Sequence, residues 1–309
     1  MDELPPAGQD SAAGADALGE ARALLAAGVV GGDVSAPGIS RVTGVHVADV
    51  EVALERCVAA GLVGAGGTVE PATAAALEAE IPPERRAEIH AIASRHWMAA
   101  GPEHLVDAVA HARAAGNLVP TNAVVLLAQR AGQMCLSLND YASAADLLQV
   151  AVDLDAADDP VALGHRLVDL ARALDGLGRV REVRDCLGRA AALGELADDP
   201  RLVAQAAVLS AFPLEWYAGN RHAAAMLARA EAMDLDEAAA VMVTAVRSVV
   251  EMRIPVDHAD DQQFAWVTRP SVGHPLAEDA LRRSEGLGPD VRGLATLAWR
   301  TAHRAPALL

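Results

Sequence analysis

The segment AQRAGQMCLSLNDYASAADLLQVA, residues 128–151, decides the fold class. Its small and apolar side chains recur at helical spacing on both sides of a turn at Asn139-Asp140: Ala128, Ala131, Gly132, Cys135, Ala144, Leu148 and Ala151. Small residues let two antiparallel helices approach closely, while leucines at this spacing bury against the neighbouring unit. The segment therefore predicts a helix-turn-helix unit of the tetratricopeptide type.

Two further units repeat this pattern imperfectly, with turns at Gly178-Arg179-Val180 and Gly219-Asn220-Arg221. Tyr141 and Val180 are 39 positions apart, and Val180 and Arg221 are 41 apart, so the units are longer than the usual ~34 residues. An Asp-Asp-Pro sequence at 158–160 and again at 198–200 separates one unit from the next, because acids and proline favour a helix start. We predict a right-handed tetratricopeptide-like superhelix over 71–253.

The region before the repeats, residues 16–70, is predicted to be a small winged-helix domain. Helical periodicity covers 16–27 and 47–60, and Ser35 with Pro37 marks the start of a short helix between them. Apolar and β-branched residues flank the glycines at 64–67 and predict a small hairpin over 62–70. Residues 1–15 lack periodicity and are predicted to be a disordered acidic tail. The fold class is thus all-α apart from a wing.

The charges argue against nucleic-acid binding by this region. The chain carries 42 acidic residues against 25 basic ones, a net charge of −17, and all the basic residues are Arg. In the helix that would enter a major groove, Asp49, Glu51 and Glu55 outnumber Arg56, so its face would repel phosphates. The absence of Lys excludes a P-loop and a Schiff-base enzyme within these residues.

The C-terminal part is predicted to be less regular than the repeats. A helix is expected from Asp236 to Arg253, followed by a loop or linker over 254–289 that contains several prolines. Residues 290–309 are helical by periodicity and are expected to begin a further repeat, whose unpaired apolar face would favour homo-oligomer formation.

The order of these parts resembles a known family. The winged-helix region ends in Ala60-Gly61-Leu62-Val63, and the sequence IPPERRAEIH at 81–90 leads into Ala-rich repeats. This is similar to the region that follows the ATPase domain in the large ATP-binding LuxR-type transcriptional regulators of actinobacteria. The resemblance covers most of 16–253 and implies a superhelix that senses an effector. The 309 residues carry neither the Walker A signature nor the terminal DNA-reading helix-turn-helix of that family.

The sequence supplies no compact set of residues typical of catalysis or metal binding. His90 and His96, like His104 and His111, lack the i, i+4 spacing that places two imidazoles on one metal ion. The three cysteines, Cys57, Cys135 and Cys186, are far apart and are interpreted as buried thiols. We therefore predict no enzyme activity, no metal site and no cofactor.

The concave face of the superhelix is the predicted binding groove, because the first helix of each unit faces it. The residues expected there are Gln129, Gln133, His165, Arg172, Trp216, Tyr217 and Arg247. Polar groups beside an aromatic shelf suit a small polar effector or an extended peptide. The opposing interpretations are an ordinary solvated inner face for the set, and packing between repeats for Trp216 and Tyr217.

These observations favour a non-catalytic regulatory sensor or interaction module, which binds a small-molecule effector or a protein partner. The alternative is a free-standing helical-repeat scaffold that holds partner proteins in the same groove. The amino terminus has no signal-peptide pattern, and no apolar run approaches the ~18 residues of a membrane span. A cytoplasmic location without membrane contact is expected.

Overall fold

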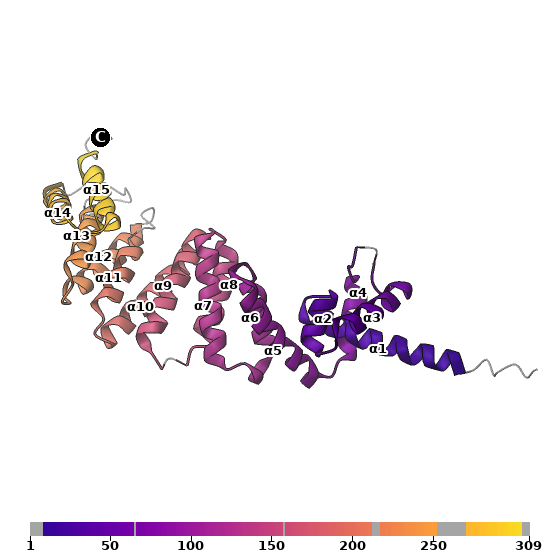
Figure 1. Ribbon diagram of the computed structural model, residues 1–309. Coiled ribbons are helices and arrows are strands. Elements are labelled where there is room, and N and C mark those ends of the chain that lie inside the picture. The colour runs from indigo at the N-terminus through magenta and orange to yellow at the C-terminus, as the bar shows by residue number, and fades with distance from the viewer. Residues whose placement is uncertain (1–8, 65, 157, 212–216, 252–269, 305–309) are drawn as a thin grey trace, which may run out of the picture. The chain divides into compact units, whose positions relative to one another are not determined.

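The computed structural model describes residues 9–64, 66–156, 158–211, 217–251 and 270–304, and these form two compact units that meet at Ala131 and Gly132. The described residues form helices joined by turns and loops, with no strand among them, which confirms the all-α class. Figure 1 shows the helices in chain order. Helices α1 to α6 of the first unit are Gln9–Gly31, Ala36–Thr43, Val47–Ala59, Pro71–Glu80, Pro83–Ala100 and Leu105–Ala114, with 3-10 turns at Pro102–His104 and Gly116–Leu118.

Helix α7, Thr121–Ser137, carries the chain from the first unit into the second. Helices α8 to α15 of the second unit are Tyr141–Asp153, Pro160–Gly176, Val180–Leu196, Pro200–Ser210, Tyr217–Glu231, Glu237–Glu251, Pro270–Arg283 and Pro289–Arg304.

The core of the first unit surrounds α1, which packs on α2, α3, α4 and α5. Leu25 of α1, Leu77 of α4 and Ile89 of α5 are all fully buried in it. Burial around most of its circumference explains why α1 is apolar on every side between residues 23 and 30. The sequence signals for α2 are confirmed: Ser35 caps the helix through a bond from the Gly38 amide (3.1 Å), with proline in the first turn.

The predicted wing was expected to be a hairpin over 62–70, of which residue 65 lies outside the described part of the chain. The described residues between α3 and α4 contain no strand, and the Gly64 amide donates to the Thr68 carbonyl (2.8 Å) as part of a turn. A pair of segments this short, joined through glycines, has too little apolar surface to hold a ladder. The expected domain boundary at residue 70 also differs from the observed units, because α4 and the start of α5 complete the first core.

The expected tail over 1–15 is shorter in the structure, because α1 begins at Gln9. Residues 1–8 lie outside the described part of the chain. The Ala-rich sequence 12–18 favours helix extension ahead of the first buried residue, Ala21.

The second unit is a series of sequential helix hairpins (Figure 1). Each helix from α8 to α13 packs on the next one, and α9, α11 and α13 also contact one another in order. Helices α9 and α11 begin at the two predicted Asp-Pro sequences: Asp159 accepts bonds from the Val161 and Ala162 amides, each 3.0 Å. Asp199 caps α11 in the same way through the Leu202 amide (3.1 Å).

The linker predicted over 254–289 is wrong for a large part of its length. Residues 270–283 form α14, which packs on α13, and α15 packs on both of them. Pro270 stands in the first turn, where it costs no hydrogen bond, whereas Pro275 lies inside the helix. The buried face around Ala277 and Ala280 holds this helix despite Pro275. Residues 252–269 lie outside the described part.

Glycine at the closest approach of two helices is required by the packing. A Cβ atom on Gly132 of α7 would lie 2.6 Å from Leu148 Cγ of α8, and Leu148 is fully buried. We expect Gly132→Ala to destabilise the second unit by about 1–3 kcal/mol in chemical denaturation, because overpacking outweighs the higher helix propensity of Ala. The matched control is Gly188→Ala in α10, where no atom lies within 4 Å of the added methyl group. Equal stability of the two variants would contradict the packing argument.

Candidate functional site

Two of the predicted groove residues meet on one carboxylate in the second unit. The Gln133 side-chain amide of α7 donates to Asp169 Oδ2 of α9 (2.8 Å), and Arg172 NH1 donates to Asp169 Oδ1 (3.4 Å). The Asp169 side chain is 13% exposed, whereas Gln133 and Arg172 are exposed. We call these three residues the Asp169 cluster.

The geometry of α9 explains how the cluster forms. His165, Asp169 and Arg172 stand at i, i+4 and i+7, so they share one face of the helix. His165 is exposed, one turn before Asp169. The sequence analysis missed Asp169, although the spacing between the two predicted residues on either side of it points to the same face.

The remaining predicted residues are placed elsewhere or not described. Gln129 lies one turn before Gln133 on α7 and is half-buried. Arg247 of α13 pairs with Glu231 of α12 and with Glu251 one turn along (3.6 Å). Tyr217 is the first residue of α12, but its side chain lies outside the described part of the structure, as does Trp216. The structure thus groups Gln133, His165 and Arg172, and assigns Arg247 to a separate set of ion pairs.

Arginine side chains pair with acidic side chains of other helices along the second unit. Arg229 of α12 bonds Glu195 of α10 (2.6 Å), and Arg283 of α14 bonds Glu237 of α13 (2.8 Å). These bonds lower the pKa of Glu195 and Glu237 and raise the pKa of both arginines. We therefore interpret these arginine–acid pairs as links between helices. The Asp169 cluster differs from them because it contains two of the predicted groove residues.

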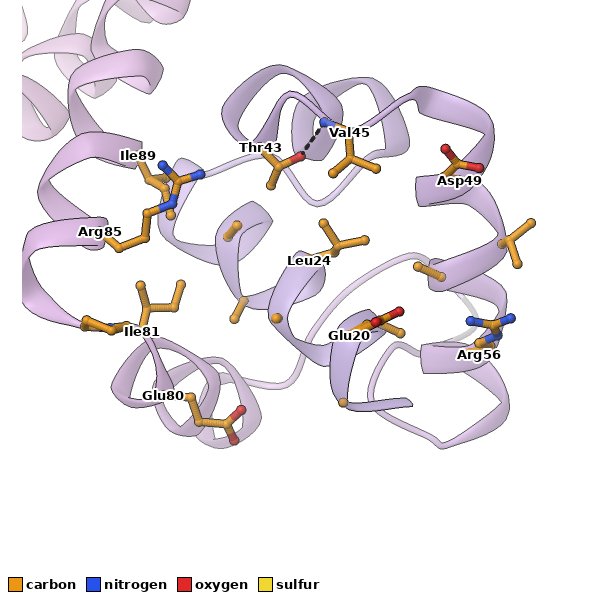
Figure 2. A pocket seen from close by; sticks show the side chains of 18 residues that line it. Glu20, Leu24, Thr43, Val45, Asp49, Arg56, Glu80, Ile81, Arg85 and Ile89 are labelled. Carbon is orange, nitrogen blue, oxygen red and sulfur yellow. Dashed lines mark hydrogen bonds between the residues drawn. The ribbon is translucent and has the colours of Figure 1, made fainter. Parts of the chain in front are cut away.

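A cavity of about 850 Å³ lies in the first unit beside α1 (Figure 2). Leu24 of α1 lies near its centre, with Ile81 and Ile89 on one side. Charged groups stand around its edge: Glu20, Asp49, Arg56, Glu80 and Arg85. This volume lies in the range of small-molecule sites, and an apolar floor with charged edges suits an amphipathic ligand.

Two histidines from neighbouring helices of the first unit contact each other. His90 Nδ1 of α5 lies 2.8 Å from His111 Nδ1 of α6, so the two rings share a hydrogen bond. The contact thus joins one member of each of the two histidine pairs that the sequence analysis rejected as metal ligands. Within the described ranges no group of three His, Cys, Asp or Glu side chains could hold a metal ion.

The cysteines are held in their unreactive form. Cys57, Cys135 and Cys186 are buried, and burial raises the pKa of each thiol above its ordinary value. A protonated thiol is a poor nucleophile. None of the three therefore has the environment of a catalytic cysteine.

Comparison with known proteins adds no assignment: no family model matches the chain, and no curated protein matches it. Among the described helices none is by itself long and apolar enough to cross a membrane, although Asp16–Gly31 and Ala36–Thr43 pass that test together as a pair bent by 92°.

Proposed function

We propose that this protein is a non-catalytic sensor or interaction module, comparable to the effector-binding middle region of LuxR-type transcriptional regulators. It acts in the cytoplasm and binds an effector or a protein partner through the face of α7 and α9. The observation that carries this proposal is the Asp169 cluster, which joins predicted groove residues from two successive repeats. In this proposal nucleic acid and membrane are not its partners.

The packing order of the second unit supports a tetratricopeptide-like arrangement. Helices α9, α11 and α13 are the first helices of successive hairpins and contact one another in order. In a superhelix of this type such helices line the concave surface. His165 and Arg172 would then stand on that surface beside Gln133. An exposed guanidinium next to an amide and an imidazole offers several donors, which suits a carboxylate-bearing effector or an acidic peptide.

The cavity beside α1 offers a second candidate position for a small effector, because it has the volume and the apolar floor that the exposed Asp169 cluster lacks. Binding there would keep the sensor function and move it from the repeats to the first unit.

Arg172→Ala is expected to weaken effector binding by about 10-fold or more without unfolding the protein, because a charged hydrogen bond is worth about 1.5–3 kcal/mol. A thermal-shift screen of the wild-type chain against metabolites identifies the ligand: at a hundredfold its Kd it adds about 2.7 kcal/mol of stability. The variant is then titrated with that ligand.

Arg181→Ala is the matched control, since Arg181 is exposed on α10. It is expected to bind as the wild type does. Normal binding by Arg172→Ala would overturn the assignment to the α7 and α9 face. If Ala23→Leu, which fills the cavity beside α1, abolishes binding instead, the effector occupies the first unit.

A further inference from the structure

His90 and His111 form a hydrogen-bonded pair of partly buried imidazoles that has no role in the proposed binding function. The two residues are 21 positions apart, and their rings meet where α5 packs on α6. The Nδ1 atoms are 2.8 Å apart, and the ring centroids are 5.1 Å apart. Nearby, the buried Ser94 hydroxyl of α5 donates to the Ala108 carbonyl of α6 (3.0 Å), which makes a second bond between the same helices.

The bond between two Nδ1 atoms limits how many protons the pair can hold. One Nδ1 must carry hydrogen and donate, while the other must be bare and accept. If both rings were imidazolium, two N–H groups would face each other at 2.8 Å. Double protonation therefore removes the hydrogen bond and places two positive charges in contact.

The groups around His90 favour its neutral form on balance. Burial lowers the pKa of His90, the Glu78 carboxylate of α4 opposes that effect, and the Arg86 guanidinium of α5 adds to it. Glu78 and Arg86 lie 3.7 Å apart, so the acid is partly neutralised by the arginine.

The groups around His111 act in the same direction. Burial lowers the pKa of His111, His90 lowers it further, and Asp107 of α6 opposes both effects. The chain just after α1 also passes close to this ring, since a Cβ atom on Gly32 would lie 3.1 Å from His111 Nε2. The nearby acid Asp33 is engaged with Arg41 (3.7 Å).

We propose that His90 and His111 form a pH-sensitive latch between α5 and α6, which is closed at neutral pH and opens on acidification. The latch goes beyond the proposed binding function and does not depend on it. Opening breaks the hydrogen bond between the rings and weakens the packing of α5 on α6, to which the bond from Ser94 to the Ala108 carbonyl also contributes.

The direction of the pH effect follows from the lowered pKa values. An unfolded histidine has a pKa near 6.5, so below that pH the opened helices bind protons that the closed latch does not. The stabilisation is complete above about pH 6.5 and is lost as the pH falls through the lower pKa values of the folded state. At one pH unit below 6.5, each ring that stays neutral shifts the opening equilibrium by about tenfold.

Hydrogen exchange of the full chain at pH 7.5 and 5.5 tests the latch. Exchange rates are normalised to those of the unfolded chain at the same pH. The protection of α6 is expected to fall by about 10-fold at pH 5.5, and by up to ~100-fold if both rings stay neutral in the closed state. Helix α8 is the internal control, and its protection is expected to stay constant. An unchanged protection of α6 would overturn the proposal.

The double variant His90→Asn/His111→Asn is expected to abolish the pH dependence in α6, because amide side chains keep a hydrogen bond but do not titrate. The matched control is His46→Asn, an exposed residue that caps α3 through its ring nitrogen. It is expected to retain the wild-type pH dependence. Persistence of that dependence in the double variant contradicts the latch.

A second measurement keeps the test decisive if the double variant fails to fold. Ring resonances of the wild-type chain, followed by NMR from pH 8 to 4.5, report each imidazole directly. We expect two coupled titrations below the ordinary range of histidine. Two independent titrations near pH 6.5 would show that the rings do not form the latch.

Discussion

Arg166→Ala is expected to destabilise the second unit by about 3–5 kcal/mol, which is a large fraction of the stability of a typical domain. Arg166 of α9 is 7% exposed and pairs with Asp155, which precedes α9 and whose side chain is 10% exposed. Removing the guanidinium takes a charged hydrogen-bond partner away from a carboxylate that is largely shielded from solvent. The free energy of unfolding in urea measures the loss.

A second variant separates the energy of the pair from the energy of leaving one charge behind. Arg166→Met/Asp155→Leu replaces both charges with apolar side chains of similar volume and is expected to recover most of the lost stability. The surface control is Arg282→Ala, whose pair with Asp279 lies in solvent and should contribute less than ~0.5 kcal/mol. An Arg166→Ala loss below 1 kcal/mol would show that the pair is effectively solvated.

Leu202→Ala is expected to cost about 2–5 kcal/mol, the range for a fully buried leucine. Leu202 of α11 is 0% exposed and fills the space beside Gly164 of α9. Its Cδ2 atom lies 2.3 Å from the position that a Cβ on Gly164 would take. The truncation therefore leaves a cavity between two helices that contact each other directly. Denaturant unfolding of the second unit measures the loss.

The double variant Gly164→Ala/Leu202→Ala tests whether the two residues share that space. The added methyl group clashes with Leu202 in the wild type but enters the cavity of the variant, so the double variant is expected to be more stable than Leu202→Ala alone. Leu196→Ala is the control, because Leu196 is 77% exposed and its loss should change stability by less than ~0.5 kcal/mol. Additive effects of the two core substitutions would contradict this packing.

The helix hairpins of the second unit were predictable because their sequence signals are local. Asp159 with Pro160 and Asp199 with Pro200 begin helices where the sequence places them, and Gly132 lies against Leu148 as the small-residue pattern requires. The predicted helix 236–253 corresponds to α13, and 290–303 to α15. Each of these predictions depends on residues within about one repeat, so capping and periodicity were sufficient.

Sequence prediction was less successful in two segments whose conformation depends on packing with the rest of the fold. The glycines at 64–67 predicted a hairpin turn, but the described residues 62–64 and 66–70 hold no strand, because a ladder needs more apolar partners than those short flanks provide. Pro275 resembles a helix breaker, yet α14 is held by the buried face around Ala277 and Ala280 against α13. In both segments the local sequence preference contributes less to stability than burial against the rest of the fold does.

The sequence by itself determined the all-α class, the helix starts at capping aspartates and the place of small residues between helices, because these depend on neighbours along the chain. Only the tertiary structure decided which side chains meet. Gln133 and Arg172 share Asp169 because α7 and α9 belong to successive hairpins, and His90 reaches His111 because α5 packs on α6. Contacts between residues 20 to 40 positions apart depend on how helices pack, which their periodicity does not specify.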